Sequence, residues 1–103
     1  MAVKLTVVYD NPVDPEAFEK HYKETHMPLA QKMPNVKRVE LAKVLPKEDG
    51  SPTPAYRTAD VYFDDYETAC KTIASPEGQA TLIDAKQIAT GGVRFLLSDI
   101  ETA

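Results

Sequence analysis

The chain has 103 residues, one cysteine and no tryptophan, and 43% of its residues are hydrophobic and 27% charged, which is typical of a single small domain. Its formal charge is −4 and its basic residues are dispersed, so the basic stripe that nucleic-acid binding needs is missing. A lone cysteine excludes an intrachain disulfide, no Cys/His spacing fits a zinc site, and no apolar run approaches the roughly 20 residues of a membrane span. We therefore predict one cytoplasmic domain over residues 1–103, with neither nucleic acid nor a membrane as partner.

The beginning of the chain predicts a strand followed by a helix. Residues 3–9, VKLTVVY, place β-branched and aromatic side chains at alternate positions, which favours a strand. Asp14 and Pro15 are typical of an N-cap and a first helical residue, so we expect a helix from there to about His26. Helical spacing predicts a buried stripe made of Phe18, Tyr22, Thr25, Leu29 and Met33.

Pro28 interrupts this helical pattern. A proline inside a helix lacks an N–H, clashes with the carbonyl four positions before it, here that of Glu24, and disfavours helical dihedrals at the preceding residue, here Met27. We therefore expect a break near Met27, followed by a short helix over PLAQKM that begins at Pro28.

The remainder of the chain predicts three strands and two helices. Ser75 and Pro76 form a strong helix start, and Gly78 in the first turn indicates close packing. The order β-α-β-β-α-α-β predicts an α+β, ferredoxin-like fold, which is a four-stranded antiparallel sheet with helices on one face. The expected strands are 36–45, 55–63 and 93–101, the helices are 64–74 and 75–89, and a proline-rich loop covers 46–54.

The sheet face opposite the helices is expected to be mixed in character. A face left to water should be polar, so we predict that a second subunit covers this one and forms a homodimer. Asp60 on that face needs a partner, for which Arg94 and Arg57 are candidates, and an ion pair that fixes the dimer is favoured over a general base. The side chains assigned to this face are Tyr56, Thr58, Asp60, Tyr62, Leu96 and Ile100.

Three stretches carry a family resemblance: DPEAFEKHYKETHMPLAQKMPNVKR, YRTADVYFDDYETA and SPEGQATLIDAKQIATGG. With KLTVVY they span nearly the whole chain, and they contain a Y-x3-H-x-P-L element and an S-P-E-G element. This pattern resembles the EthD family. The resemblance implies a dimeric α+β barrel, in which two sheets face each other and a cleft lies between each sheet and its helices. Families of this architecture include monooxygenases, isomerases and haem-degrading proteins, so the resemblance does not fix an activity.

His26 is the sharpest candidate for catalysis. It belongs to the Y-x3-H-x-P-L element and lies on the sheet side of the predicted helix. Because a histidine ordinarily titrates near pH 6.5, it is well suited to proton transfer around neutrality. The alternative is a structural histidine whose ring bonds the backbone at a helix end. His21 is expected at the surface or the rim of the same helix.

Tyr22 and Asp84 are the other catalytic candidates. The phenol of Tyr22 could donate to a carbonyl substrate, with a core or interface role as the alternative. Asp84 lies in the third stretch of the resemblance, where a carboxylate could orient His26 or belong to a solvated helix face. No nucleotide fingerprint or metal-ligand cluster is present, so we predict neither a cofactor nor a metal. Candidates for substrate binding in the cleft are Tyr62, Asp60, Phe18 and Leu29.

These features favour a small cofactor-independent enzyme that acts on an apolar organic molecule by proton transfer, isomerisation or oxidoreduction, with His26 as acid or base. An alternative is a non-catalytic accessory dimer in a degradation pathway, which binds a small apolar ligand. That alternative predicts a dry apolar cavity with no polar groups converging on His26. A third hypothesis is haem binding through His26.

Overall fold

The computed structural model of the protein describes residues 2–102. The expected order of elements is confirmed, and the helical segment between the first two strands consists of three consecutive pieces. The elements are β1 (Val3–Tyr9), α1 (Pro15–His21), η1 (Tyr22–His26), α2 (Met27–Ala30), β2 (Arg38–Lys43), β3 (Arg57–Phe63), α3 (Tyr66–Ala74), α4 (Pro76–Ile88) and β4 (Val93–Asp99).

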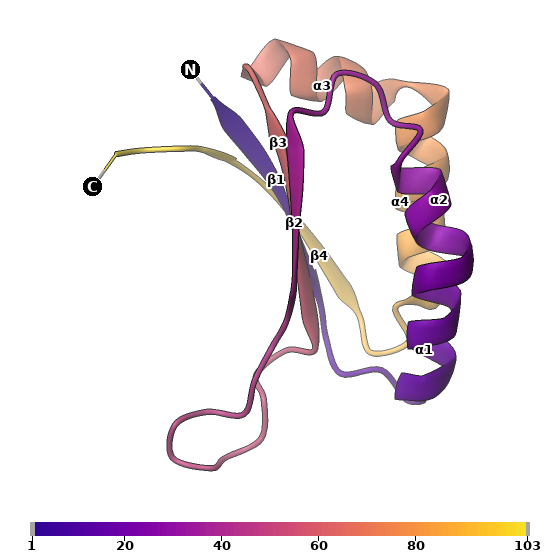
Figure 1. Cartoon of the computed structure of the whole chain (residues 1–103), viewed down its shortest axis with the longest axis vertical. Helices are drawn as coiled ribbons and strands as arrows, with labels where there is room; N and C mark the ends of the chain where they lie inside the picture. Colours follow the sequence, from indigo (N-terminus) through magenta and orange to yellow (C-terminus); the bar gives the residue numbers. More distant parts are fainter. Residues whose placement is uncertain (1, 103) are drawn as a thin grey trace.

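The four strands form one antiparallel sheet in the order β2-β3-β1-β4, and the helices cover one of its faces (Figure 1). In this register Val7 lies opposite Ala59 on one side and Phe95 on the other. The ferredoxin-like α+β fold is therefore confirmed. The core lies between the sheet and the helices, and its strand residues are Val3, Leu5, Val7, Tyr9, Ala59, Val61 and Phe63.

Capping side chains explain where the helices start. Asp14 accepts a hydrogen bond from the Ala17 N–H at 3.2 Å, and α1 begins at Pro15. Ser75 accepts from the Gly78 N–H at 3.1 Å, and α4 begins at the following proline. Each cap satisfies one of the N–H groups that a helix start leaves without a partner.

Gly78 permits the close packing of α3 and α4 that its place in the sequence indicates. A Cβ atom at this position would lie 2.1 Å from the Thr72 carbonyl oxygen and 2.7 Å from the Ile73 carbonyl oxygen. Both are backbone atoms at the end of α3, so neither can move aside as a flexible side chain would. The first turn of α4 therefore requires a glycine where it approaches the end of α3.

The break expected near Met27 is wrong, because the chain remains helical through this region. Residues Tyr22–His26 form a π-helical turn, in which the Met27 N–H bonds the Tyr22 carbonyl, and Met27 itself has helical dihedrals of φ −61° and ψ −41°. A π-turn adds one residue to a helical turn, and such turns are frequent at functional sites. Pro28 lies within the first turn of α2, and the residues that flank this helix have helical dihedrals.

The π-turn also rotates the residues that follow it, and this changes the buried stripe. Thr25, expected in the stripe, is exposed, and Leu29 is only half-buried. The inward positions after Tyr22 are occupied by His26, and then by Met27 and Met33, which pack against the core. The straight-helix projection therefore placed Thr25 and Leu29 incorrectly and underestimated how far His26 points inward.

The sheet face away from the helices carries a network of polar side chains. The Thr6 hydroxyl donates to Asp60 at 2.5 Å, and the Lys4 ammonium lies 3.7 Å from the same carboxylate. The Tyr62 hydroxyl donates to Glu40, with the Arg38 guanidinium 4.0 Å above the Tyr62 ring. Leu96, which lies beside Thr6 on the same face, is 50% exposed, so the mixed character expected of this face is confirmed.

Two predictions for this face are wrong: the ion-pair partner of Asp60 and the location of Tyr56. Asp60 pairs with neither expected arginine, because Arg57 points to the helix side and bonds Glu19 at 2.8 Å, while Arg94 lies nearest to Asp10 at 3.8 Å. Tyr56 precedes the first residue of β3, and its ring packs edge-on against Phe18, with centroids 5.2 Å apart.

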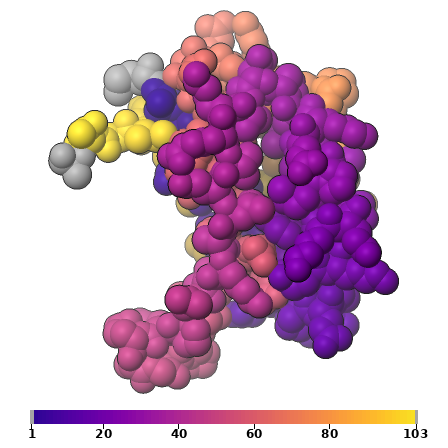
Figure 2. All heavy atoms as spheres, in the orientation of Figure 1, coloured from indigo at the N-terminus to yellow at the C-terminus, as the bar shows by residue number. Residues whose placement is uncertain are grey.

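Between β2 and β3, residues 46–54 project beyond the end of the sheet and form a separate lobe in the space-filling view (Figure 2). Over residues 2–102, no helix combines the length and apolar character needed to span a bilayer.

Candidate functional site

His26 and Asp84 form a buried pair between η1 and α4. The His26 Nδ1 atom lies 2.9 Å from Asp84 Oδ2, and each side chain is only 8% exposed. The π-turn points His26 toward the sheet, and the close start of α4 on Gly78 fixes the helix that carries Asp84. A carboxylate can only accept, so Nδ1 carries the proton and Nε2 is the free acceptor of the neutral ring.

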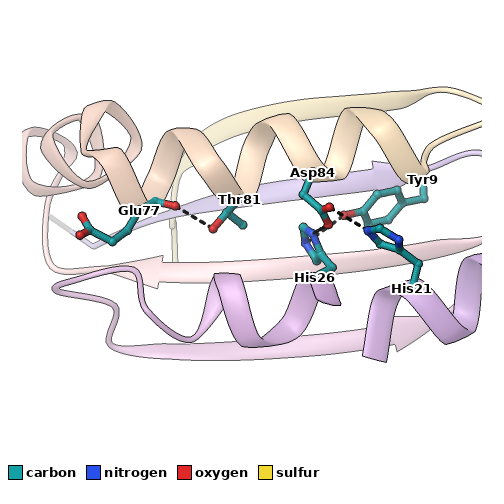
Figure 3. A network of polar contacts seen from close by, with 6 residues as sticks. All are labelled: Tyr9, His21, His26, Glu77, Thr81 and Asp84. Atoms are coloured by element: carbon teal, nitrogen blue, oxygen red, sulfur yellow. Dashed lines mark hydrogen bonds and ion pairs between the residues drawn. The ribbon is translucent and has the colours of Figure 1, made fainter. Parts of the chain in front are cut away.

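Asp84 also bonds a second histidine. The His21 Nε2 atom lies 2.7 Å from Asp84 Oδ1, so the two carboxylate oxygens each face one imidazole (Figure 3). His21 and His26 stand at the two ends of the π-turn, which brings both rings to the same side of the helix. The prediction that His21 lies at the rim is confirmed by its 39% exposure, but its bond to Asp84 was not foreseen.

Tyr9 completes the cluster from the sheet side. Its hydroxyl lies 3.4 Å from His26 Nε2, and because that nitrogen is an acceptor, the phenol is the donor of this long contact (Figure 3). Tyr9 is 1% exposed and is the last residue of β1. His26 therefore has a polar partner at each ring nitrogen, one from α4 and one from β1.

The Tyr22 ring holds the imidazole in place. It stacks on His26 with centroids 5.4 Å apart and an interplanar angle of 15°, and it meets Tyr9 edge-on at 5.9 Å. On the same ring, the Arg57 guanidinium lies 4.9 Å from the centroid, while its charge is paired with Glu19. Burial would raise the pKa of Glu19, but the hydrogen bond and charge of Arg57 hold it below its usual value.

An apolar cavity of about 40 Å³ lies beside His26, between the sheet and the helices. This volume has room for a few water-sized groups but not for an organic molecule. The residues that line it include Met27 and Met33, whose side chains are flexible thioethers. They also include Val39 and Leu41 of the edge strand β2, each of which is 43% exposed. The cavity is therefore bounded on one side by flexible or partly open groups.

Burial sets the protonation of the cluster. It lowers the pKa of His26 below its ordinary value, although the hydrogen bond and the charge of Asp84 oppose this effect. Burial also raises the pKa of Tyr22, and it raises that of Tyr9 far above its usual range, with Tyr22 and Asp84 adding to the effect. At neutral pH the site therefore contains a neutral imidazole and two neutral phenols.

The structure brings together three of the seven predicted site residues. His26, Tyr22 and Asp84 form one cluster, and Phe18 packs behind it, stacked on Tyr22 at 5.5 Å. Leu29 lies at a separate surface hollow with Pro76 and Glu77. Tyr62 and Asp60 lie on the opposite face of the sheet from His26.

Tyr9 and His21 are the members of the cluster that sequence reasoning missed. Tyr9 appeared only as the last apolar residue of a strand, and a strand pattern alone gives no reason to connect its hydroxyl with a histidine. For His21 a signal was available. Two histidines five positions apart, followed by a proline inside a helix, are compatible with a π-turn that aligns both rings.

The helices on one face of a β2-β3-β1-β4 sheet define a ferredoxin-like α+β protein, and a buried His–Asp pair lies beside its apolar cavity. Residues 10–92 match the EthD domain. The chain belongs to the EthD family, as its sequence motifs indicated.

Two similar proteins cover nearly the whole chain. An uncharacterized 11.0 kDa protein from the thcB-thcC intergenic region of Rhodococcus erythropolis is 43% identical over 99 residues, which are 96% of this chain and 95% of that protein. The crystal structure of an EthD family protein from Bacillus halodurans has a TM-score of 0.91 and 29% identity, and the match covers 98% of this chain and 100% of that one.

More distant structures share the fold alone. SnoaB from Streptomyces nogalater, a cofactor-independent oxygenase, has a TM-score of 0.68 and 17% identity over 99% of this chain and 95% of its own. Ferredoxin-like proteins from Bacteroides fragilis, Thermobifida fusca and Jannaschia, between 11% and 15% identical, are dimeric.

Proposed function

We propose that this protein is a cofactor-independent enzyme that acts on a small apolar organic molecule, with His26 as its general acid/base. One observation carries the proposal. His26 contacts the Asp84 carboxylate through Nδ1 at 2.9 Å, its Nε2 atom faces the Tyr9 hydroxyl, and the residue lines the apolar cavity. An imidazole oriented by a carboxylate and shielded from water is a common arrangement for proton transfer near neutral pH.

The proposed step is removal of an acidic proton from the substrate. His26 Nε2 accepts the proton, and the electron pair remains on the substrate as an enolate or phenolate. Asp84 stabilises the resulting imidazolium through the Nδ1–H, and Tyr9 donates to the developing oxyanion in place of His26. Return of the proton to another carbon would give isomerisation, whereas reaction of the anion with dioxygen would give oxygenation.

Tyr22 supports this step by shape. Its stacked ring fixes the plane of the imidazole, and its raised pKa keeps it a neutral donor at the cavity wall. A substrate larger than the 40 Å³ cavity requires a change of rotamer at Met27 or Met33.

The alternative of a non-catalytic carrier, an accessory dimer that binds a small apolar ligand, receives less support. A binding protein for an apolar ligand has no use for a buried carboxylate, and desolvating one is costly unless it is hydrogen-bonded. Here Tyr9 and Asp84 converge on His26 beside the cavity, contrary to what a carrier predicts. Haem binding through His26 is tested by an absorbance titration, in which ligation would have to displace Tyr9 from Nε2.

Proton abstraction can be tested without knowing the natural substrate. The wild-type protein is incubated in D₂O with small aryl ketones, such as acetophenone and 2-tetralone, and exchange of the α-hydrogens is followed by NMR. We expect acceleration of roughly 100-fold or more over buffer, and its loss in His26→Gln. Lys23→Gln, at an exposed position of the same π-turn, is the control that should keep the wild-type rate. Exchange that persists in folded His26→Gln would contradict the proposal.

We also propose that the protein is a homodimer in which the sheet face away from the helices is covered by the second copy. The exposure of Leu96, at 50%, and Ile100, at 37%, supports this, as do the dimeric proteins of similar fold.

A further inference from the structure

Asp84 has two histidine partners, and the proposed reaction uses only one of them. The carboxylate lies 2.9 Å from His26 Nδ1 and 2.7 Å from His21 Nε2. We propose that His21 is a positioning residue that shares the charge of Asp84 with His26, and that its protonation in solvent thereby controls how basic the buried imidazole is. Naming His26 as the base rests on the proposed function, whereas the coupling between the two histidines does not.

The two rings differ in their access to water. The His21 side chain is 39% exposed, whereas His26 and Asp84 are each 8% exposed. His21 borders a surface hollow of about 330 Å³ formed by α1 and α4, which does not include any residue of the cavity beside His26. Protons from solvent therefore reach His21 directly. Their effect on the buried His26 passes through Asp84, which bonds both rings.

A positive charge on His21 makes His26 less basic. A protonated His21 places a positive charge against Asp84 Oδ1, where it offsets the negative charge that stabilises the His26 imidazolium at Oδ2. A second positive charge at His26 then becomes less favourable. Burial and the charge of His21 both lower the pKa of His26, and Asp84 raises it.

Few other groups compete for control of His21. On α4 the facing charge is Asp84, and Gln87, which borders the same hollow, is neutral. On the segment that precedes α1, Asp14 also borders the hollow, but its carboxylate caps the helix by accepting from Ala17. From η1, His26 bonds the other oxygen of Asp84. Asp84 is therefore the direct route between the two imidazoles.

The coupling predicts how the site responds to acid. While His21 carries a proton, its charge beside Asp84 makes His26 a weaker base than Asp84 alone would make it. The neutral form of His26, which accepts the proton in the proposed reaction, thus persists to a lower pH than it would with Asp84 alone. His21 in this way extends the active range toward acid at the cost of intrinsic basicity.

An NMR titration of the imidazole resonances tests this inference without substrate. The chain has two histidines, so His21→Gln leaves one imidazole signal, that of His26. Glutamine keeps an N–H that can reach Asp84 but carries no charge, so we expect the His26 titration midpoint to move to higher pH. His21→Arg keeps a positive charge at every pH, so its His26 midpoint should lie below that of His21→Gln.

Lys20→Gln is the matched control, because it removes an exposed charge next to His21 that bonds no carboxylate in the structure. Its His26 midpoint should equal that of the wild type. The inference is overturned if folded His21→Gln shows an unchanged or lower midpoint, or if the midpoint of His21→Arg is not below that of His21→Gln. Loss of ketone exchange with the coupling intact would count against the proposed function alone.

Discussion

The carboxylate of Asp84 bonds both histidines of the site. Only part of this arrangement could be predicted from the individual residues. His26 and Asp84 stood out because an imidazole and a carboxylate lay in motifs expected to be on elements covering the same sheet. Their contact depends on packing, because 58 positions of chain separate them. The role of Tyr9 could not be predicted, because the hydroxyl of a core tyrosine acquires a partner only when strand and helix are placed together.

The buried His26 should make the protein sensitive to acid. Its pKa is lowered in the folded state by burial, so the unfolded chain binds the proton more readily. The stability that His26 contributes is therefore fully present above its ordinary pKa of about 6.5 and is lost as pH falls from there through the lowered folded value. We expect the Tm of the wild type to fall more steeply between pH 7 and pH 5 than that of His26→Gln. Calorimetric scans that run parallel for the two proteins would contradict this assignment.

At the scale of elements, the order and type of helices and strands followed from local patterns, and the exception was the segment around Pro28. The sequence rules for proline predict a break, because they assume that the preceding turn is α-helical. In the structure the preceding turn is a π-turn over Tyr22–His26, which changes which carbonyl faces Pro28. That choice depends on tertiary contacts, since the wider turn is what turns His26 and His21 together toward Asp84.

The contact between α3 and α4 predicts a large effect of a small substitution. In Gly78→Ala the new methyl group would lie 2.1 Å from the Thr72 carbonyl oxygen, so the start of α4 must move. We expect a loss of unfolding free energy of about 3 kcal/mol or more, since such overpacking typically costs 1–3 kcal/mol and here the neighbours are backbone atoms. Urea denaturation followed by circular dichroism measures it.

Gly50→Ala is the matched control for this substitution. Gly50 has a φ of 82° and no neighbour within 4 Å, so alanine there introduces backbone strain alone. That strain amounts to about 1–2 kcal/mol. If Gly78→Ala were no more destabilising than Gly50→Ala, the packing of α4 would not depend on close approach, and the placement of Asp84 would need another explanation.

At the scale of the whole molecule, the sheet divides two different environments. One face carries the core and the His26 cluster, and the other carries charged and hydroxyl side chains together with exposed aliphatic residues. The sequence allowed this division to be predicted, because strand residues alternate between faces. It did not allow the partners of Asp60 to be identified, since Lys4 and Thr6 reach it through the pairing of β1 with β3.

The proposed dimer can be tested by placing a charge on each side of the molecule in turn. Leu96 lies on the sheet face away from the helices and is 50% exposed, whereas Ile83 lies on α4 and is 54% exposed. A glutamate at an interface buries an unpaired charge, but at a free surface it costs little. We therefore expect Leu96→Glu to shift the protein from dimer to monomer in light scattering coupled to size exclusion, and Ile83→Glu to remain a dimer. The two positions have similar exposure and receive the same substitution. A difference between the variants therefore reports on which face of the molecule forms the interface. Dissociation by Ile83→Glu but not by Leu96→Glu would place the interface on the helical layer, and the sheet-to-sheet arrangement would then be wrong.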